Sequence, residues 1–222
     1  MSALEDALFR PALNKNWHMV PQERAALLYV LTQARPEVSI EIGTFLAGSL
    51  RPISTYSNRV ITFDIDEQQH RIAPMFPNTT FVSGDTAITL PPVIKGLNES
   101  TEELGFILID GSHETEGVKA DINNCLKYTP KTKTCFILMH DSSNPAVRKG
   151  ILDADWHECG YVHGVDVDFV SGALYDRPDI NREIWGGLGI AILKPMPRDI
   201  DLVIQTPFQH SLNQLHLNSI YR

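Results

Sequence analysis

Hydrophobic positions along the chain alternate between two periods. Short apolar runs rich in β-branched residues occur at 38-VSIEIG-43, 60-VITFDI-65, 80-TFVSG-84, 105-GFILID-110 and 135-CFILMHD-141. Helix-length segments separate these runs, and in 115-TEGVKADINNCLKY-128 the apolar residues fall on one face of a helix. Apolar strands that alternate with helices predict a parallel sheet covered by helices on both faces.

The pattern changes beyond residue 160. The β-rich run 161-YVHGVDVDFVSGAL-174 and the apolar run 187-GLGIAILKP-195 follow each other without a long helical pattern between them. We expect them to form an antiparallel pair at the edge of the sheet. The predicted fold class is therefore α/β, a doubly wound, mostly parallel, seven-stranded sheet with an antiparallel edge strand.

A helix is predicted over 21-PQERAALLYVLTQARP-36, because Pro21 suits a first helical turn and Pro36 ends the pattern. Three leucines make one apolar stripe along it, and these are Leu27, Leu28 and Leu31. We divide the chain into an N-terminal helical segment, residues 1–36, and one domain, residues 37–222. The leucine stripe could pack on a second subunit, so a homodimer is one expectation.

Composition limits the classes of partner. The 222 residues are 43% hydrophobic and 21% charged, which is typical of a folded globular protein. The net charge is −8, and no Lys/Arg cluster is present, so we expect neither nucleic acid nor an anionic membrane surface as a partner. A small molecule is the expected partner.

Cellular location follows from what the sequence does not contain. The first residues carry no signal-peptide pattern, and no run approaches the ~20 apolar residues that a membrane span needs. The three cysteines include no CxxC pair, and Cys125 and Cys135 fall inside apolar patterns. We therefore expect buried thiols in a soluble, cytoplasmic protein.

Each predicted parallel strand ends in residues that carry chemistry. The strand ends are Glu41-Ile42-Gly43, Asp64, Gly84-Asp85, Asp110 and His140-Asp141. Ligands of open α/β sheets bind at the carboxyl ends of the strands. The sequence therefore predicts a binding site at this edge of the sheet.

The first of these loops is 40-IEIGTFLAGSL-50, in which Gly43 and Gly48 bracket a turn before a helix. The spacing lacks the Lys-Ser/Thr of a P-loop and the GxGxxG of a dinucleotide site, so a structural turn is an open alternative. Asp64 follows about 20 residues later, where an acid can accept hydrogen bonds from ribose hydroxyls. A solvated loop acid is the alternative for Asp64.

Taken together, EIGTFLAGS, the acid of FDID, GDT and IDGSH resemble a class I S-adenosylmethionine-dependent methyltransferase. The resemblance covers about residues 38–195. The nearest groups are small-molecule O-methyltransferases of the catechol type and of the macrolide-sugar and cephalosporin types. The family's fold is Rossmann-like, in agreement with the strand and helix pattern.

The resemblance implies a role for each motif. Glu41, Gly43 and the loop Thr44–Ser49 would hold the methionine part of the cofactor, Asp64 its ribose, and Asp85 and Thr86 would lie by the adenine. The full set implied to bind the cofactor is Glu41, Gly43, Thr44, Phe45, Gly48, Ser49, Asp64, Asp85, Thr86 and Asp110.

In the metal-dependent relatives, the acid that ends the fourth strand binds a divalent cation and a base follows three residues later. The corresponding residues are Asp110 and His113, and the fifth strand supplies His140 and Asp141 as further ligands. The relatives carry two acids, or an acid and an amide, where this chain has His140-Asp141. Mg²⁺ is the expected ion, with His140 pointing away; another metal, or none, stays open because imidazole suits other ions better.

The predicted function is methyl transfer from S-adenosylmethionine to a hydroxyl of a small molecule, such as a sugar or glycosylated metabolite, with His113 as the general base. Trp185, before the pair Gly186-Gly187, could line the substrate pocket or belong to the core. The alternatives are a nicotinamide-dependent oxidoreductase, which the missing GxGxxG disfavours, and a non-catalytic cofactor-binding protein.

Overall fold

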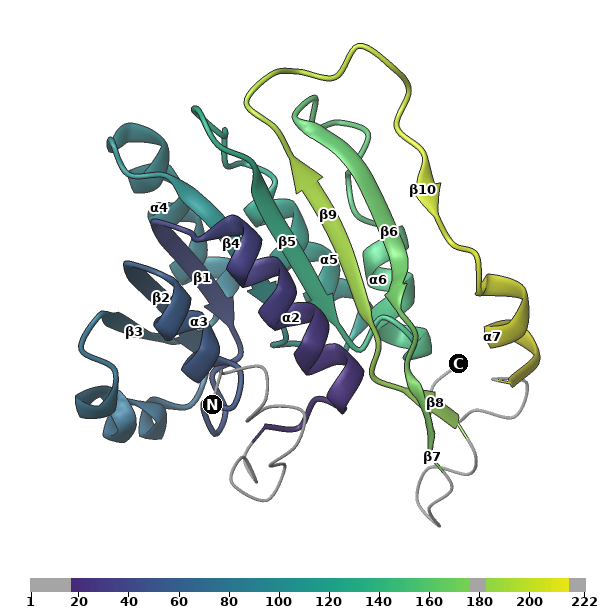
Figure 1. Ribbon diagram of the computed structural model, residues 1–222, viewed down its shortest axis with the longest axis horizontal. Helices are drawn as coiled ribbons and strands as arrows, with labels where there is room; N and C mark the ends of the chain where they lie inside the picture. Colours follow the sequence, from purple (N-terminus) through teal and green to yellow (C-terminus); the bar gives the residue numbers. More distant parts are fainter. Residues whose placement is uncertain (1–16, 176–182, 216–222) are drawn as a thin grey trace.

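The computed structural model describes residues 17–175 and 183–215, and a twisted eight-stranded sheet forms its centre (Figure 1). The strands are β1 (Val38–Ile42), β2 (Arg59–Asp64), β3 (Thr79–Ser83), β4 (Leu104–Ile109), β5 (Cys135–His140), β6 (Val162–Val170), β9 (Leu188–Leu193) and β10 (Ile204–Gln205). Their spatial order is β10-β6-β9-β5-β4-β1-β2-β3. A short antiparallel ribbon, β7 (Ala173–Tyr175) with β8 (Glu183–Trp185), extends beside this sheet.

Strand β9 runs antiparallel to its neighbours β5 and β6, and the other pairs are parallel. This confirms the predicted mostly parallel sheet with an antiparallel strand towards one edge. The sheet has eight strands where seven were predicted, because β10 pairs with β6. At two residues, β10 is too short to give a hydrophobic period that a sequence could reveal.

Helices cover both faces of the sheet, as predicted. They are α2 (Pro21–Ala34), α3 (Leu50–Tyr56), α4 (Thr86–Glu99), α5 (Thr115–Cys125), α6 (Pro145–Leu152) and α7 (Gln209–Leu215), with a 3-10 helix η2 (Glu67–Met75). Figure 1 shows α2 and α3 on one face and α4, α5 and α6 on the other. Each face has its own apolar core, and Cys125 and Cys135 are buried free thiols in the core below α4, α5 and α6. Within the described ranges, none of the helices combines the length and apolarity that crossing a membrane requires.

The leucine stripe of α2 packs on the sheet of its own chain. Leu27, Leu28 and Leu31 are at most 2% exposed and share a core with residues of β4, β5 and β9. The stripe therefore does not offer a surface to a second subunit, and the reason given for a homodimer does not hold. The division of the chain at residue 36 stays a prediction.

A buried ion pair fixes the segment that follows β9. The guanidinium of Arg148 on α6 donates to both carboxylate oxygens of Asp168 on β6, at 2.6 and 3.0 Å. Asp168 also accepts from the backbone N–H of Phe208, and Arg148 donates to Gln209. These bonds attach the start of α7 to α6 and β6.

A carboxyl group lies inside the core on the side of α2 and α3. Glu41 of β1 is fully buried, and its two carboxyl oxygens accept hydrogen bonds from Ser49 Oγ and Thr62 Oγ1, each at 2.7 Å. Desolvation raises the pKa of Glu41 to about 8, against the effect of these bonds, and the carboxylates of Asp110 and Asp64 add to the rise. Near neutral pH, Glu41 is therefore largely uncharged and ties the loop after β1 to β2.

This raised pKa predicts a pH-dependent stability. The folded state holds a proton on Glu41 that the unfolded chain releases above the ordinary glutamate pKa of 4.5. The contribution to the free energy of unfolding is therefore full below pH 4.5 and is lost as the pH rises towards about 8. Because Glu41→Gln is neutral throughout, we expect the Tm of this variant to rise relative to wild type between pH 5 and pH 8.

Thermal unfolding at several pH values measures this difference. Glu99→Gln, on an exposed part of α4, controls for the loss of one carboxylate without burial. A Glu41→Gln difference that stays constant from pH 5 to pH 8 would contradict a buried, protonated Glu41.

Candidate active site

A cavity of about 1020 Å³ opens where the carboxyl ends of β1 to β5 meet. Nearly all the residues predicted for the site line it, and these are Gly43, Thr44, Phe45, Gly48, Ser49, Asp64, Asp85, Thr86, Asp110, His113, His140 and Asp141. Trp185 lines it as well. Glu41 is the exception, since it lies fully buried behind the loop and contacts the cavity wall through its hydrogen bond with Ser49.

Gly43 lies where two neighbouring strand ends make their closest approach. Its φ is +92°, and a Cβ atom built on it would lie 2.1 Å from the carbonyl oxygen of Asp110. The backbone N–H of Asp110 in turn donates to the carbonyl of Ile42. Only glycine fits this position, so the glycine that the sequence singled out brings the loop after β1 against the end of β4.

Asp64 holds the loop that follows Gly43. Its Oδ2 accepts hydrogen bonds from the backbone N–H groups of Thr44 at 3.0 Å and Phe45 at 2.9 Å, and its Oδ1 accepts from Asp66. Phe45 has a positive φ of 43°. The carboxylate therefore stabilises a strained turn and still faces the cavity, where its remaining lone pairs could accept bonds from a ligand.

At the end of β3, Asp85 caps helix α4 by accepting from the N–H of Ala87 at 2.8 Å. Thr86 donates its hydroxyl proton to Asp121 of α5 at 2.6 Å, and burial raises the pKa of Asp121. Asp121 also lines the cavity and was not predicted. The signal for it was a charged residue on the apolar face of the 115–128 helix, between Val118 and Ile122.

Two imidazoles and two carboxylates meet at the ends of β4 and β5. His140 Nδ1 lies 2.9 Å from Asp110 Oδ1 and 3.5 Å from Asp141 Oδ2. His113 Nε2, on the loop after β4, lies 3.2 Å from Asp141 Oδ2 and 4.0 Å from Asp110 Oδ1. The side chain of His113 is 54% exposed and that of His140 only 9%, so His113 is the more accessible of the two imidazoles.

The four groups change one another's pKa values. Burial alone would raise the pKa of Asp110, but the imidazoles of His140 and His113 outweigh it and hold that pKa at about 2. Burial lowers the pKa of His140, yet Asp110 and Asp141 raise it well above its usual range. The pKa of His113 is raised by Asp110, partly opposed by desolvation, and Asp141 adds to the rise.

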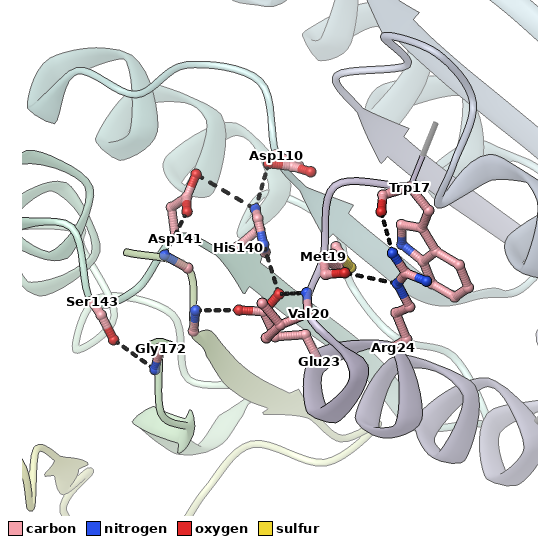
Figure 2. Close-up of polar contacts among 12 residues, drawn as sticks. Trp17, Met19, Val20, Glu23, Arg24, Asp110, His140, Asp141, Ser143 and Gly172 are labelled. Atoms are coloured by element: carbon pink, nitrogen blue, oxygen red, sulfur yellow. Dashed lines mark hydrogen bonds and ion pairs between the residues drawn. The ribbon is translucent and has the colours of Figure 1, made fainter. Parts of the chain in front are cut away.

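Glu23 of α2 lies beneath this cluster and was not predicted. Figure 2 shows its carboxylate between His140 and the backbone of Val20. Its Oε2 is 3.4 Å from His140 Nε2 and accepts from Val20 N at 2.7 Å, while Oε1 accepts from Gly187 N at 2.6 Å. A glutamate in a first helical turn predicts no more than capping, so the contact with His140 could not be predicted from the residues around Glu23.

The side chains predicted to hold a metal are close enough to share one. Asp110, His140 and Asp141 each offer a ligand atom, and these atoms lie within 4.8 Å of one another. His140 faces the two carboxylates, so it does not point away as expected for a Mg²⁺ site made of oxygens alone. Two carboxylate oxygens and one imidazole nitrogen fit a divalent cation and suit a transition metal better than Mg²⁺.

The side chains that line the cavity carry an excess of acidic groups. Six acidic side chains line it, and these are Glu23, Asp64, Asp85, Asp110, Asp121 and Asp141. Among the described residues that line it there is no lysine or arginine. Such a cavity favours a cationic ligand and disfavours a polyphosphate.

Part of the chain matches a known protein family. Residues 40–142 match the sequence profile of a methyltransferase domain family. A search of curated protein sequences gave no significant match.

Several solved structures of similar fold are methyltransferases. An O-methyltransferase from Bacillus cereus in complex with SAH is 15% identical, with 86% of this chain and 90% of that one covered and a TM-score of 0.56. The O-methyltransferase TomG from Streptomyces achromogenes, in complex with SAM, is 12% identical, with coverage of 87% and 90% and a TM-score of 0.53. The N-methyltransferase NodS from Bradyrhizobium japonicum, in complex with S-adenosylhomocysteine, is 13% identical, with coverage of 87% and 97% and a TM-score of 0.54.

At these identities the structures establish the fold, and residues 40–142 are similar to a methyltransferase domain. Fold and family match together confirm the predicted resemblance to the class I S-adenosylmethionine-dependent methyltransferases.

Proposed function

We propose that this protein transfers a methyl group from S-adenosylmethionine to a hydroxyl of a small molecule. The observation that carries the proposal is a single cavity that joins the glycine loop after β1, the acid that ends β2, and the exposed His113. Two of the similar structures are O-methyltransferases, which supports a hydroxyl acceptor. A third is an N-methyltransferase, so the choice of oxygen rests on the base and on the carboxylates beside it.

The residues that line the cavity suit the cofactor. Gly43 and the loop Thr44–Ser49 would hold the methionine part, Asp64 would accept bonds from the ribose hydroxyls, and Asp85 and Thr86 would lie by the adenine. The acidic lining suits a sulfonium and its amino group, and S-adenosylmethionine has no phosphate that would need a lysine or arginine. The same lining disfavours the pyrophosphate of a nicotinamide dinucleotide, the alternative cofactor.

His113 would act as the general base. His113 lines the cavity and its side chain is half exposed, so an acceptor hydroxyl can approach the imidazole and give up its proton there. Asp141, 3.2 Å from Nε2, would stabilise the imidazolium that forms. The chain thus positions donor, acceptor and base, and no covalent intermediate with the protein is needed.

Asp110, His140 and Asp141 would hold a divalent cation beside His113. A bound cation would polarise the acceptor hydroxyl and offset the carboxylate charges that raise the pKa of His113. Trp185 at the cavity wall would contact the acceptor, and its indole suits the apolar face of an aromatic or sugar ring.

Cofactor binding gives the first test. Calorimetry with S-adenosylhomocysteine should show saturable binding of one molecule per chain. Asp64→Ala should weaken it at least tenfold, about 1.4 kcal/mol, because this carboxylate both faces the ligand and holds the loop. Asp66→Ala, two residues further on and outside the cavity lining, is the matched control. Absence of binding by the wild type, or preferential binding of NAD, would refute the proposal.

The base gives the second test. Formation of S-adenosylhomocysteine is followed with a panel of phenols, catechols and sugars as acceptors. His113→Ala should lower the rate with an active acceptor by about 10²–10⁴, the usual contribution of a general base, and leave S-adenosylhomocysteine binding close to wild type. His163→Ala removes a half-buried histidine of β6 that lies outside the cavity lining and bonds the carbonyl of Met196, and it serves as the control. A near-normal rate for His113→Ala would assign that residue to structure.

A further inference from the structure

The two nitrogens of His140 face different partners. Nδ1 points to the carboxylates of Asp110 and Asp141, and Nε2 points the other way, to Glu23 (Figure 2). Glu23 is 1% exposed and 117 residues away in the sequence. A buried acid from α2 has therefore been placed behind a strand-end imidazole on β5.

Glu23 acts as an acceptor on both of its oxygens. Oε2 accepts from Val20 N and Oε1 from Gly187 N, and these bonds fix the carboxylate beneath the imidazole. Carboxylate acceptors face both ring nitrogens, so the metal-free imidazole of His140 carries a proton on each. A cation bound at Nδ1 would displace the proton there, and Glu23 would keep the proton on Nε2. A carboxylate behind the distal nitrogen of a metal-bound histidine is a common outer-shell arrangement.

The separations within the cluster suit a shared ion. Two adjacent ligand atoms that each lie roughly 2.1 Å from the same cation are about 3.0–3.4 Å from each other. The distances from His140 Nδ1 to Asp110 Oδ1 and Asp141 Oδ2 are 2.9 and 3.5 Å. Only small shifts are needed to place one ion among the three atoms.

We infer that Glu23 is a positioning residue that makes His140 Nδ1 a metal ligand, and that the site of Asp110, His140 and Asp141 takes a first-row transition metal in preference to Mg²⁺. The inference deepens the metal part of the proposed function and rests on it. Imidazole suits Mn²⁺, Fe²⁺, Co²⁺ and Zn²⁺ better than Mg²⁺, which prefers oxygen ligands and retains its water. Because Glu23 also bonds Gly187, it couples the site to the turn between β8 and β9.

Metal binding without cofactor or acceptor tests the inference. Calorimetry with the metal-free protein should show Co²⁺ binding at one site per chain at least tenfold more tightly than Mg²⁺. Pulsed EPR of the Mn²⁺-loaded protein should detect the nitrogen of a coordinated imidazole. Tighter binding of Mg²⁺, no bound Co²⁺, or no nitrogen signal would overturn the inference.

Two variants separate the role of Glu23 from a general effect on folding. In Glu23→Gln, one side-chain oxygen remains to accept the hydrogen bonds that the two carboxylate oxygens of Glu23 accept in the wild type. This variant should therefore weaken Co²⁺ binding by about 10–100-fold and alter Mg²⁺ binding far less. His140→Asn exchanges the nitrogen ligand for an amide oxygen and should abolish the preference for Co²⁺ and the nitrogen signal. Glu99→Gln is the matched surface control, and thermal unfolding verifies that each variant is folded.

The outcomes distinguish this inference from the proposed function. If Glu23→Gln is folded and binds Co²⁺ as wild type does, Glu23 has no role in the site. If His140→Asn keeps the preference for Co²⁺, His140 is an ion-pair partner of Asp110 and not a ligand. Binding of S-adenosylhomocysteine in metal-free buffer is measured on the same samples, so a failure of the metal site is separable from a failure of the methyltransferase proposal.

Discussion

Two carboxylates that lie close together at a buried sheet edge need positive charge between them. Asp110 and Asp141 are at the ends of adjacent parallel strands, and the ligand atoms they share with His140 lie within 4.8 Å of one another. The like charges would repel strongly in this poorly solvated place. His140 from below and His113 from the cavity side balance them. The chemistry of the site follows from this balance, because it attracts a cation and places a base beside it.

The scaffold concentrates these groups through a few close contacts. Gly43 brings the loop after β1 against the backbone of Asp110, and Asp64 holds the next two residues of that loop. Glu23 joins α2 to His140 and to Gly187, so the helix on one face of the sheet also forms part of the site floor. The loop proposed to hold S-adenosylmethionine and the cluster of two carboxylates and two imidazoles are thus built on the same strand ends. Methyl transfer between two bound molecules would require such proximity.

The sequence predicted well what depends on local periodicity. Apolar runs located the five parallel strands, and the polar residues that follow them located the cavity edge, since parallel strands end on one side. The sequence could not reveal the role of Glu23, because the contact between Glu23 and His140 joins residues 117 positions apart. The local pattern around Glu23 is that of a helix cap. The direction of His140 was also mispredicted: on a strand end either face is open, and the choice depends on a tertiary partner.

A crystal structure with S-adenosylhomocysteine and Co²⁺ would show whether one cavity holds both the cofactor and the charged cluster. We expect the nucleoside in the cavity between Gly43 and Asp85, its ribose hydroxyls on Asp64, its sulfur on the side of His113, and the metal among Asp110, His140 and Asp141. A nucleoside bound outside this cavity, or with its sulfur remote from His113, would contradict this expectation.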